Sequence, residues 1–133
     1  MPALEDNSQE IPGQRLAAWA EALYLSNLLI APGLAFLILL WLYFRRSADT
    51  PALAVCHLRQ TIFASILAAV LLLTISLVIL QLGGLASATT WIIAILYFIT
   101  CHAALVLLGV LGLTKALAGQ KFSYPLMGRR CDR

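Results

Sequence analysis

Charged residues are scarce in this chain of 133 residues: Asp, Glu, Lys and Arg make up 11 % of it, against 62 % hydrophobic residues. A soluble domain usually holds roughly 45–50 % apolar and about 25 % charged residues. The mean hydropathy of the chain is +0.91. A soluble core of this size is too small to bury so much apolar surface. We therefore expect an all-α membrane protein, with the lipid bilayer as its solvent.

The motifs of common enzyme classes are also missing. No pair of carboxylates lies in or near an apolar segment, and there is no Gly-rich phosphate loop and no serine elbow. The three cysteines are odd in number and follow no disulfide or zinc spacing. The net charge is +3, but the basic residues are too few, and too clearly placed at the ends of apolar segments, for nucleic-acid binding. The sequence therefore predicts no enzyme, no cofactor, no metal and no nucleic-acid partner.

Three apolar segments are long enough to span a bilayer. Trp91–Leu113 and Thr61–Leu82 contain no charged residue, and at ~1.5 Å per residue each crosses a ~30 Å hydrocarbon core. Tyr24–Phe44 is interrupted in its middle by Pro32-Gly33. We predict three transmembrane helices packed as a small bundle, the first kinked at Pro32-Gly33. The alternative for this first segment is a re-entrant hairpin, because neither half of it alone is long enough to span.

These spans divide the chain into three parts. Residues 1–14 are a polar, flexible N-terminal tail, residues 15–126 form the transmembrane domain, and residues 127–133 are a basic C-terminal tail. Within the domain, Ser47–Gln60 is expected to be a loop, and the short uncharged Gly83–Thr90 to join two antiparallel helices.

The basic residues predict the orientation of the chain. Eight of the nine lie in the first loop or after the third span, and the Gly83–Thr90 turn has none. Lys and Arg are enriched in cytoplasmic loops of membrane proteins. Three spans then place the protein in the bacterial inner membrane with its N-terminus periplasmic and its C-terminus cytoplasmic, whereas the hairpin alternative brings the N-terminus inside as well. The eight residues are Arg45, Arg46, Arg59, Lys115, Lys121, Arg129, Arg130 and Arg133.

Small residues recur in the second and third spans at spacings that favour close helix packing. They are Ala64, Ala68, Ala69, Gly109 and Gly112. We expect these positions to let another helix approach, either within the chain or from a second membrane subunit.

His102 is the most notable polar side chain, because its place in the third span is close to the bilayer midplane. Such groups serve as proton relays, quinone contacts or haem ligands, or else are neutral and hydrogen-bonded to a neighbouring helix. No second ionisable group accompanies it in the membrane, so we favour the neutral side chain. The only other histidine, His57, lies in the first loop, too far along the membrane normal to share a haem. The remaining intramembrane polar candidates are Thr100, Thr74 and Asn27.

Two stretches carry a family resemblance. The first comprises Leu40-Trp41, Arg45-Arg46, Thr50-Pro51, His57 and Gln60-Thr61-Ile62-Phe63, and the second is the run ALAGQKFSYPL, from Ala116 to Leu126. Together they resemble a family of small bacterial membrane proteins of unknown function, distantly similar to the channel-like membrane component of the chloroplast Tic import machinery. The family brings no catalytic residues to this chain.

These observations lead to one expected function and one alternative. The chain is expected to be a non-enzymatic integral inner-membrane protein, an accessory or assembly subunit that contacts the lipid bilayer and other integral membrane subunits or a second copy of itself. The alternative is an electron-transfer or proton-relay subunit that uses His102.

Overall fold

The computed structural model describes residues 10–125 and residue 131, and all regular structure in these residues is helical. The all-α class predicted from the sequence is therefore confirmed. α3, η1 and α4 follow one another without a break, so that they form a single rod, Ala52–Gly83. The elements are α1 (Gln14–Leu29), α2 (Leu34–Arg45), α3 (Ala52–Ala69), the π-helical η1 (Val70–Ile75), α4 (Ser76–Gly83) and α5 (Ala88–Leu117).

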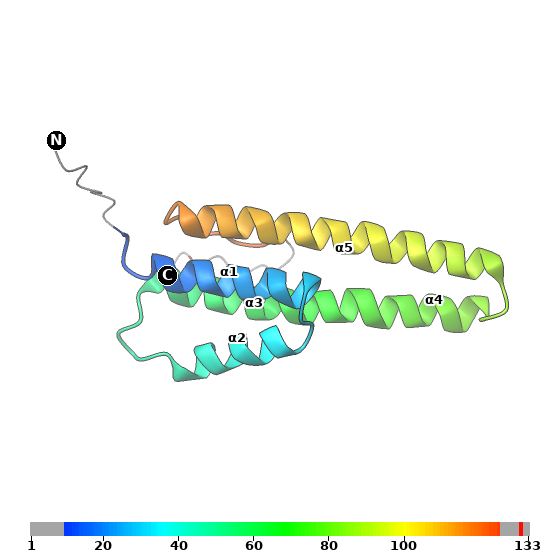
Figure 1. The fold of residues 1–133 in the computed structure, drawn as a ribbon, viewed down its shortest axis with the longest axis horizontal. Coiled ribbons are helices and arrows are strands. Elements are labelled where there is room, and N and C mark those ends of the chain that lie inside the picture. The colour runs from blue at the N-terminus through cyan, green and yellow to red at the C-terminus, as the bar shows by residue number, and fades with distance from the viewer. Residues whose placement is uncertain (1–9, 126–130, 132–133) are drawn as a thin grey trace.

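α1 and α2 form a helical hairpin (Figure 1). Between them, Gly33 adopts a φ of 86°, and its N–H donates to the side-chain oxygen of Asn27 over 2.8 Å. Glycine adopts this left-handed region without steric cost, and Pro32 has no N–H to continue a helix. The predicted continuous span Tyr24–Phe44, kinked at Pro32-Gly33, is therefore wrong, and the chain turns back on itself as in the alternative.

Two helices of the described residues, rather than three, are long and apolar enough to cross a membrane: Ala52–Gly83, with 32 residues, and Ala88–Leu117, with 30 residues. The second contains the expected span Trp91–Leu113. The expected loop before the first of them is shorter than predicted. α3 already begins at Ala52, so His57 lies in a helix and not in a loop.

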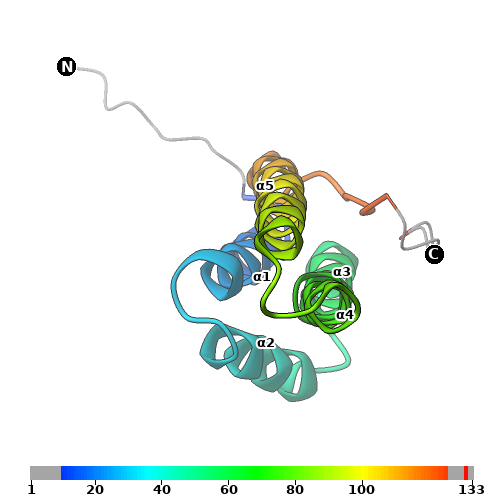
Figure 2. The ribbon, with the colours of Figure 1, turned by 90° about the vertical axis from the view of Figure 1, so that its right-hand side faces the viewer.

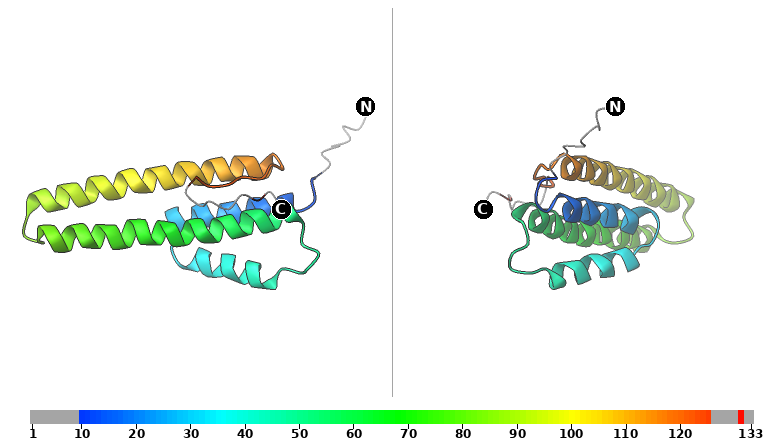
Figure 3. Two further views of the ribbon diagram at one scale, coloured as in Figure 1. Left: turned by 180° about the vertical axis from the view of Figure 1, so that it is seen from behind. Right: turned by 60° about the vertical axis from the view of Figure 1, so that its left-hand side comes forward.

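The helices differ in length, and this divides the molecule in two. At ~1.5 Å per residue the two long rods measure ~45–48 Å, against ~24 Å for α1. We call "base" the half in which α1 and α2 lie beside α3 and the last part of α5, residues 105–117. We call "arm" the other half, in which only η1, α4 and residues 88–104 of α5 remain (Figures 1 and 3). Viewed along the rods, the hairpin of α1 and α2 lies to one side of α3 and α5 (Figure 2).

Small residues bring α1 close to its neighbours in the base. Ala17 contacts Leu53 and Ala116, and Ala20 contacts Leu39 and Leu58. Further along α1, a cluster of Tyr24, Ala64 and Tyr124 is followed by one that joins Leu28 to Ala68, Leu72 and Leu105. Because the α1 contacts run from Ala116 to Leu105 on α5, the hairpin ends about half-way along that helix.

Beyond Leu72, which packs against Leu28 and Leu105 at the border with the base, the contacts of the arm are between its own two helices, and α4 has no buried residue. The π-helical segment interrupts the regular ladder of the rod, and the Tyr97 hydroxyl donates to the Leu71 carbonyl there over 2.9 Å. At the far end, Thr90 donates to the Gly83 carbonyl over 2.7 Å. These bonds hold the two helices of the arm together.

The start of α1 and the end of α5 lie at the same end of the molecule. The Gln14 side-chain amide donates to the Leu117 carbonyl over 2.5 Å, which ties the two helix ends together. The hairpin thus returns the chain to the end of the molecule at which α1 begins, whereas three successive spans would leave the two ends of the helical domain at opposite ends of the bundle.

Candidate functional site

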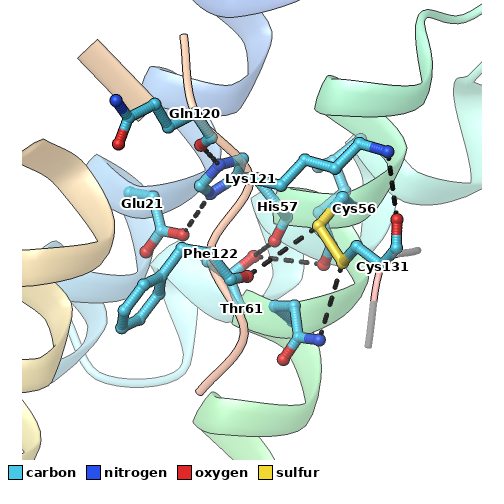
Figure 4. The surroundings of a disulfide bond; sticks show 10 residues. Glu21, Cys56, His57, Thr61, Gln120, Lys121, Phe122 and Cys131 are labelled. Carbon is cyan, nitrogen blue, oxygen red and sulfur yellow. Dashed lines mark hydrogen bonds and ion pairs between the residues drawn. A yellow bond between two sulfur atoms is a disulfide. The ribbon is translucent and has the colours of Figure 1, made fainter. Parts of the chain in front are cut away.

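The most polar buried feature is a pair formed by Glu21 of α1 and His57 of α3. Both side chains are 0 % exposed, and His57 Nδ1 lies 2.6 Å from Glu21 Oε1. The second ring nitrogen, Nε2, lies 3.0 Å from the carbonyl oxygen of Gln120 (Figure 4). The pair therefore joins two helices to the segment that follows α5.

The partners of the pair define its protonation. A backbone carbonyl only accepts, so His57 Nε2 carries a proton and donates it to Gln120. A second proton lies between His57 Nδ1 and Glu21 Oε1. With this proton on the ring, the pair is an imidazolium facing a carboxylate, which together carry no net charge. A buried ion pair needs such additional hydrogen bonds to offset its desolvation.

Residues 118–125, which we call the strap, cover the pair. The Tyr124 hydroxyl donates to Glu21 Oε2 over 2.6 Å, so both carboxylate oxygens have a partner. Burial and the neighbouring Glu21 charge raise the pKa of Tyr124 above its ordinary value, and its hydroxyl therefore keeps its proton and remains a donor. The Tyr124 ring is itself held edge-on by Tyr24 and Phe122, with ring centroids 5.7 Å and 4.9 Å away.

Backbone features place the pair where it is. Glu21 lies one helical turn from Ala17 and Tyr24, on the buried face of α1. Gly112 of α5 leaves room for it, since a Cβ there would lie 2.5 Å from Glu21 Oε2 and 2.8 Å from the Tyr124 hydroxyl. In the same way a Cβ on Gly109 would lie 2.8 Å from the Tyr24 ring. Both glycines are thus needed for α1 and the strap to approach α5.

A disulfide lies directly beside the pair. It joins Cys56, the neighbour of His57 on α3, to Cys131, with a Cα–Cα distance of 5.6 Å (Figure 4). Lys121 Nζ donates to the Cys131 carbonyl over 3.0 Å. The prediction that the cysteines form no disulfide framework is wrong, because a helix start and a distant tail meet here and sequence spacing does not show such an encounter. Cys101 on α5 is free.

The Glu21–His57 pair holds α1, α3 and the strap together. Its polar atoms are already bonded to one another, and it is enclosed by α1, α3, α5 and the strap. An open groove of about 340 Å³ between α1 and α5, lined by residues that include Arg15, Trp19 and Leu113, does not involve Glu21 or His57. Within the part of the chain that the structure describes, no three His, Cys, Asp or Glu residues gather in a manner suited to a metal ion.

The polar residues singled out in the sequence lie apart from this pair. His102 is half-buried on α5, with its ring stacked on Phe98 at 5.8 Å, and its Nδ1 is enclosed without a hydrogen-bond partner among the described residues. Thr100 and Thr74 are exposed on the arm. Asn27 shapes the hairpin turn through its bond to Gly33.

The small residues predicted to mediate packing lie mostly inside the chain. Ala64 and Ala68 are each 2 % exposed, and they contact Tyr24, Leu28 and their surroundings. Gly109 and Gly112 are buried against α1, whereas Ala69 is exposed. Four of the five positions thus serve contacts within the base.

The sequence offered one signal that pointed to the pair. Glu21 is the only acidic residue between Glu10 and Asp49, and it lies inside an otherwise apolar helical run. A lone carboxylate in such a run needs a partner if it is buried. The hairpin was only the alternative prediction and the helical start of α3 was not predicted, so His57 was not recognised as that partner.

Comparisons with known proteins return nothing: no family model, no curated protein and no solved structure matches this chain.

Proposed function

We propose that this chain is a non-enzymatic integral protein of the bacterial inner membrane that packs, as an accessory or assembly subunit, against other membrane proteins through its arm. One observation carries this proposal: the base supplies its own helix contacts, whereas the arm has only two helices and leaves its outer faces bare. The exposed apolar side chains of the arm include Leu77, Ile92, Ile95 and Ile99. A two-helix hairpin of this kind is completed by helices from a neighbouring subunit.

In this proposal, the lengths of the two rods indicate how deep the base and the arm each lie in the bilayer. A rod of ~48 Å exceeds a ~30 Å hydrocarbon core by more than 15 Å. The uncharged turn after Gly83 suits the far membrane surface, with the Trp91 indole at the interface. The excess length then lies at the basic end, so that the Glu21–His57 pair is at the headgroup level. The tip of the α1–α2 hairpin comes to rest near the midplane as a re-entrant element.

The distribution of charge supports the orientation. In the hairpin arrangement Arg15 at the start of α1 joins the basic end, which already holds Arg45, Arg46, Arg59 and Lys115. We therefore propose that this whole end faces the cytoplasm. The start of α1 and the end of α5 are then both on the cytoplasmic side.

The resemblance to small bacterial membrane proteins, with their distant similarity to the Tic component, fits this proposal at the level of location. It adds no substrate and no partner.

Site-specific photocrosslinking in native membranes tests the proposal. A photoreactive amino acid replaces Ile95 on the arm or Leu37 on α2, which are 51 % and 63 % exposed. We expect protein adducts from position 95 and lipid adducts alone from position 37. Lipid adducts alone from both positions, together with a monomer after gentle solubilisation, would contradict the proposal.

A further inference from the structure

The Cys56–Cys131 disulfide lies at the end of the molecule that carries the basic residues. Lys121 contacts Cys131 directly, and Arg59 follows Cys56 by one turn on α3. In the proposed orientation this end faces the cytoplasm, where thiol pools keep cysteines reduced and persistent disulfides are rare. A cysteine pair placed at bonding distance on that side is therefore one that forms and breaks.

The disulfide also fixes the position of the strap. Between α5 and Cys131 the strap crosses the Glu21–His57 pair, with the Gln120 carbonyl directed at His57 and the Phe122 carbonyl at Cys56 (Figure 4). The Gln120 carbonyl accepts from His57, Tyr124 donates to Glu21, and the Phe122 carbonyl lies 3.8 Å from Cys56 Sγ. The disulfide thus closes the chain over the pair, at a point on α3 adjacent to His57.

We propose that Cys56 and Cys131 form a reversible redox site whose oxidation locks the strap over the Glu21–His57 pair and whose reduction lets the strap open. This inference rests on the proposed orientation. It assigns the disulfide a regulatory role that a packing subunit does not need for its fold.

The two cysteines have different access, and this sets the order of the reaction. Cys131 is partly exposed and Cys56 is 6 % exposed. The Cys131 thiolate attacks a low-molecular-weight disulfide of the glutathione class, forming a mixed disulfide and expelling one thiolate. The Cys56 thiolate then attacks Cys131 Sγ and expels the second. The two cysteines lose two electrons and two protons, and the two released thiols gain them.

Reduction leaves the strap with weaker attachments. The hydrogen bonds from Tyr124 to Glu21 and from His57 to Gln120 remain, but each of them exchanges with water once the covalent tie is gone. Transient local opening of the strap admits solvent to the residues that it covers. The reduced form therefore exposes an ion pair that the oxidised form keeps enclosed.

The redox state itself is measured by trapping thiols in the full-length protein. Cells are quenched in acid, and the membranes are labelled with a maleimide–polyethylene glycol that adds mass for each free thiol. We expect three labels in untreated cells and one, on Cys101, after treatment with diamide. One label in untreated cells, or three after diamide, would overturn the proposal. Cys101→Ser is the control, since it lowers both counts by one and leaves the response intact.

The locking of the strap is measured separately, by hydrogen exchange of residues 118–125 in lipid nanodiscs. We expect exchange in this segment to rise several-fold on reduction, with residues 88–104 of the arm unchanged. Cys131→Ser should show the faster exchange under oxidising and reducing conditions alike. Equal exchange in the two redox states would show that the disulfide does not restrain the strap, and would contradict the regulatory role.

The orientation has its own test, so that the two failures are distinguishable. Ala48, exposed in the loop between α2 and α3, is replaced by Cys in a variant whose three native cysteines are Ser. An impermeant maleimide should label Ala48→Cys only after the spheroplasts are permeabilised. Labelling of intact spheroplasts would overturn the orientation, and with it the reversible site, whatever the exchange data show.

Discussion

The base and the arm are built from the same apolar composition but satisfy their polar atoms differently. In the base, both oxygens of Glu21 and both ring nitrogens of His57 have partners within the chain. Among the described residues the Ser65 hydroxyl of the base lacks a partner, and so do the enclosed Nδ1 of His102 and the Ser76 hydroxyl of the arm. A buried polar atom without a partner costs free energy, and a lipid environment offers no water to supply one. The base therefore pairs its buried carboxylate and imidazole within the chain, whereas the imidazole of the arm has one ring nitrogen left for a group from a neighbouring molecule.

Side contacts follow the same division. In the base, the small residues of α1, α3 and α5 pack within the chain, where Glu21 and Tyr24 of α1 lie against glycines of α5. Beyond the tip of the hairpin, the two long helices contact each other through one face and leave the remaining faces bare. Mutations that add volume or remove a hydrogen-bond partner should therefore lower the stability of the purified chain when they lie in the base, and change it little when they lie in the arm.

Removing the carboxylate of Glu21 tests the base most severely. Glu21→Ala leaves the His57 imidazolium and the Tyr124 hydroxyl buried without their partner. Breaking a buried ion pair in this way costs about 3–5 kcal/mol. We expect a much lower melting temperature in detergent and little protein in the membrane, by thermal unfolding and by immunoblot.

Two matched variants separate the charge from the hydrogen bonds. Glu21→Gln keeps an acceptor for Tyr124 and His57, and should lose clearly less stability than Glu21→Ala. The double variant Glu21→Gln, His57→Gln removes both charges and should be no less stable than Glu21→Gln alone. If all three variants had the melting temperature of the wild type, the pair would contribute nothing to the stability of the base.

The features of the arm follow from local sequence, whereas those of the base depend on contacts between residues far apart in the chain. The uncharged stretch Trp91–Leu113 within α5 and its helical character follow from local composition, and both were predicted. The hairpin was only an alternative, because Pro32-Gly33 is compatible with a kink or a turn, and contacts of α1 with α3 and α5 decide between them. The Glu21–His57 pair depends on residues 36 positions apart, and the disulfide on residues 75 apart. No local pattern encodes which distant side chains meet.

Two adjacent alanines on α3 compare a buried face with an exposed face of the same helix, and the expected effect is intermediate in size. Ala68 is 2 % exposed beside Leu28 and Leu105, whereas Ala69 is exposed. Ala68→Ile forces extra volume between α3 and α1 and should destabilise the chain by about 1–3 kcal/mol. Ala69→Ile adds the same volume on a bare face and should leave the isolated protein unchanged in thermal unfolding.

The Ala69→Ile variant also reports on partners. If a neighbouring subunit covers that face of α3, the variant should lose the complex on native gels while keeping its melting temperature as a purified chain. An intact complex would mean that this face of α3 lies against lipid. Equal destabilisation by the two substitutions would show that the hairpin does not pack against α3 as the structure has it.

The smallest expected effect is at His102, on the arm. If this residue is a neutral side chain that a neighbouring helix hydrogen-bonds, His102→Gln keeps a donor and an acceptor and should be nearly silent. His102→Leu should cost little more, because hydrogen bonds between membrane helices average about 0.6 kcal/mol. The measurement is the amount of assembled complex and its activity in native membranes. A proton relay or a cofactor contact would instead leave the complex assembled and inactive in both variants. The Gln variant therefore decides the matter, since only a chemical role for the imidazole requires that it fail.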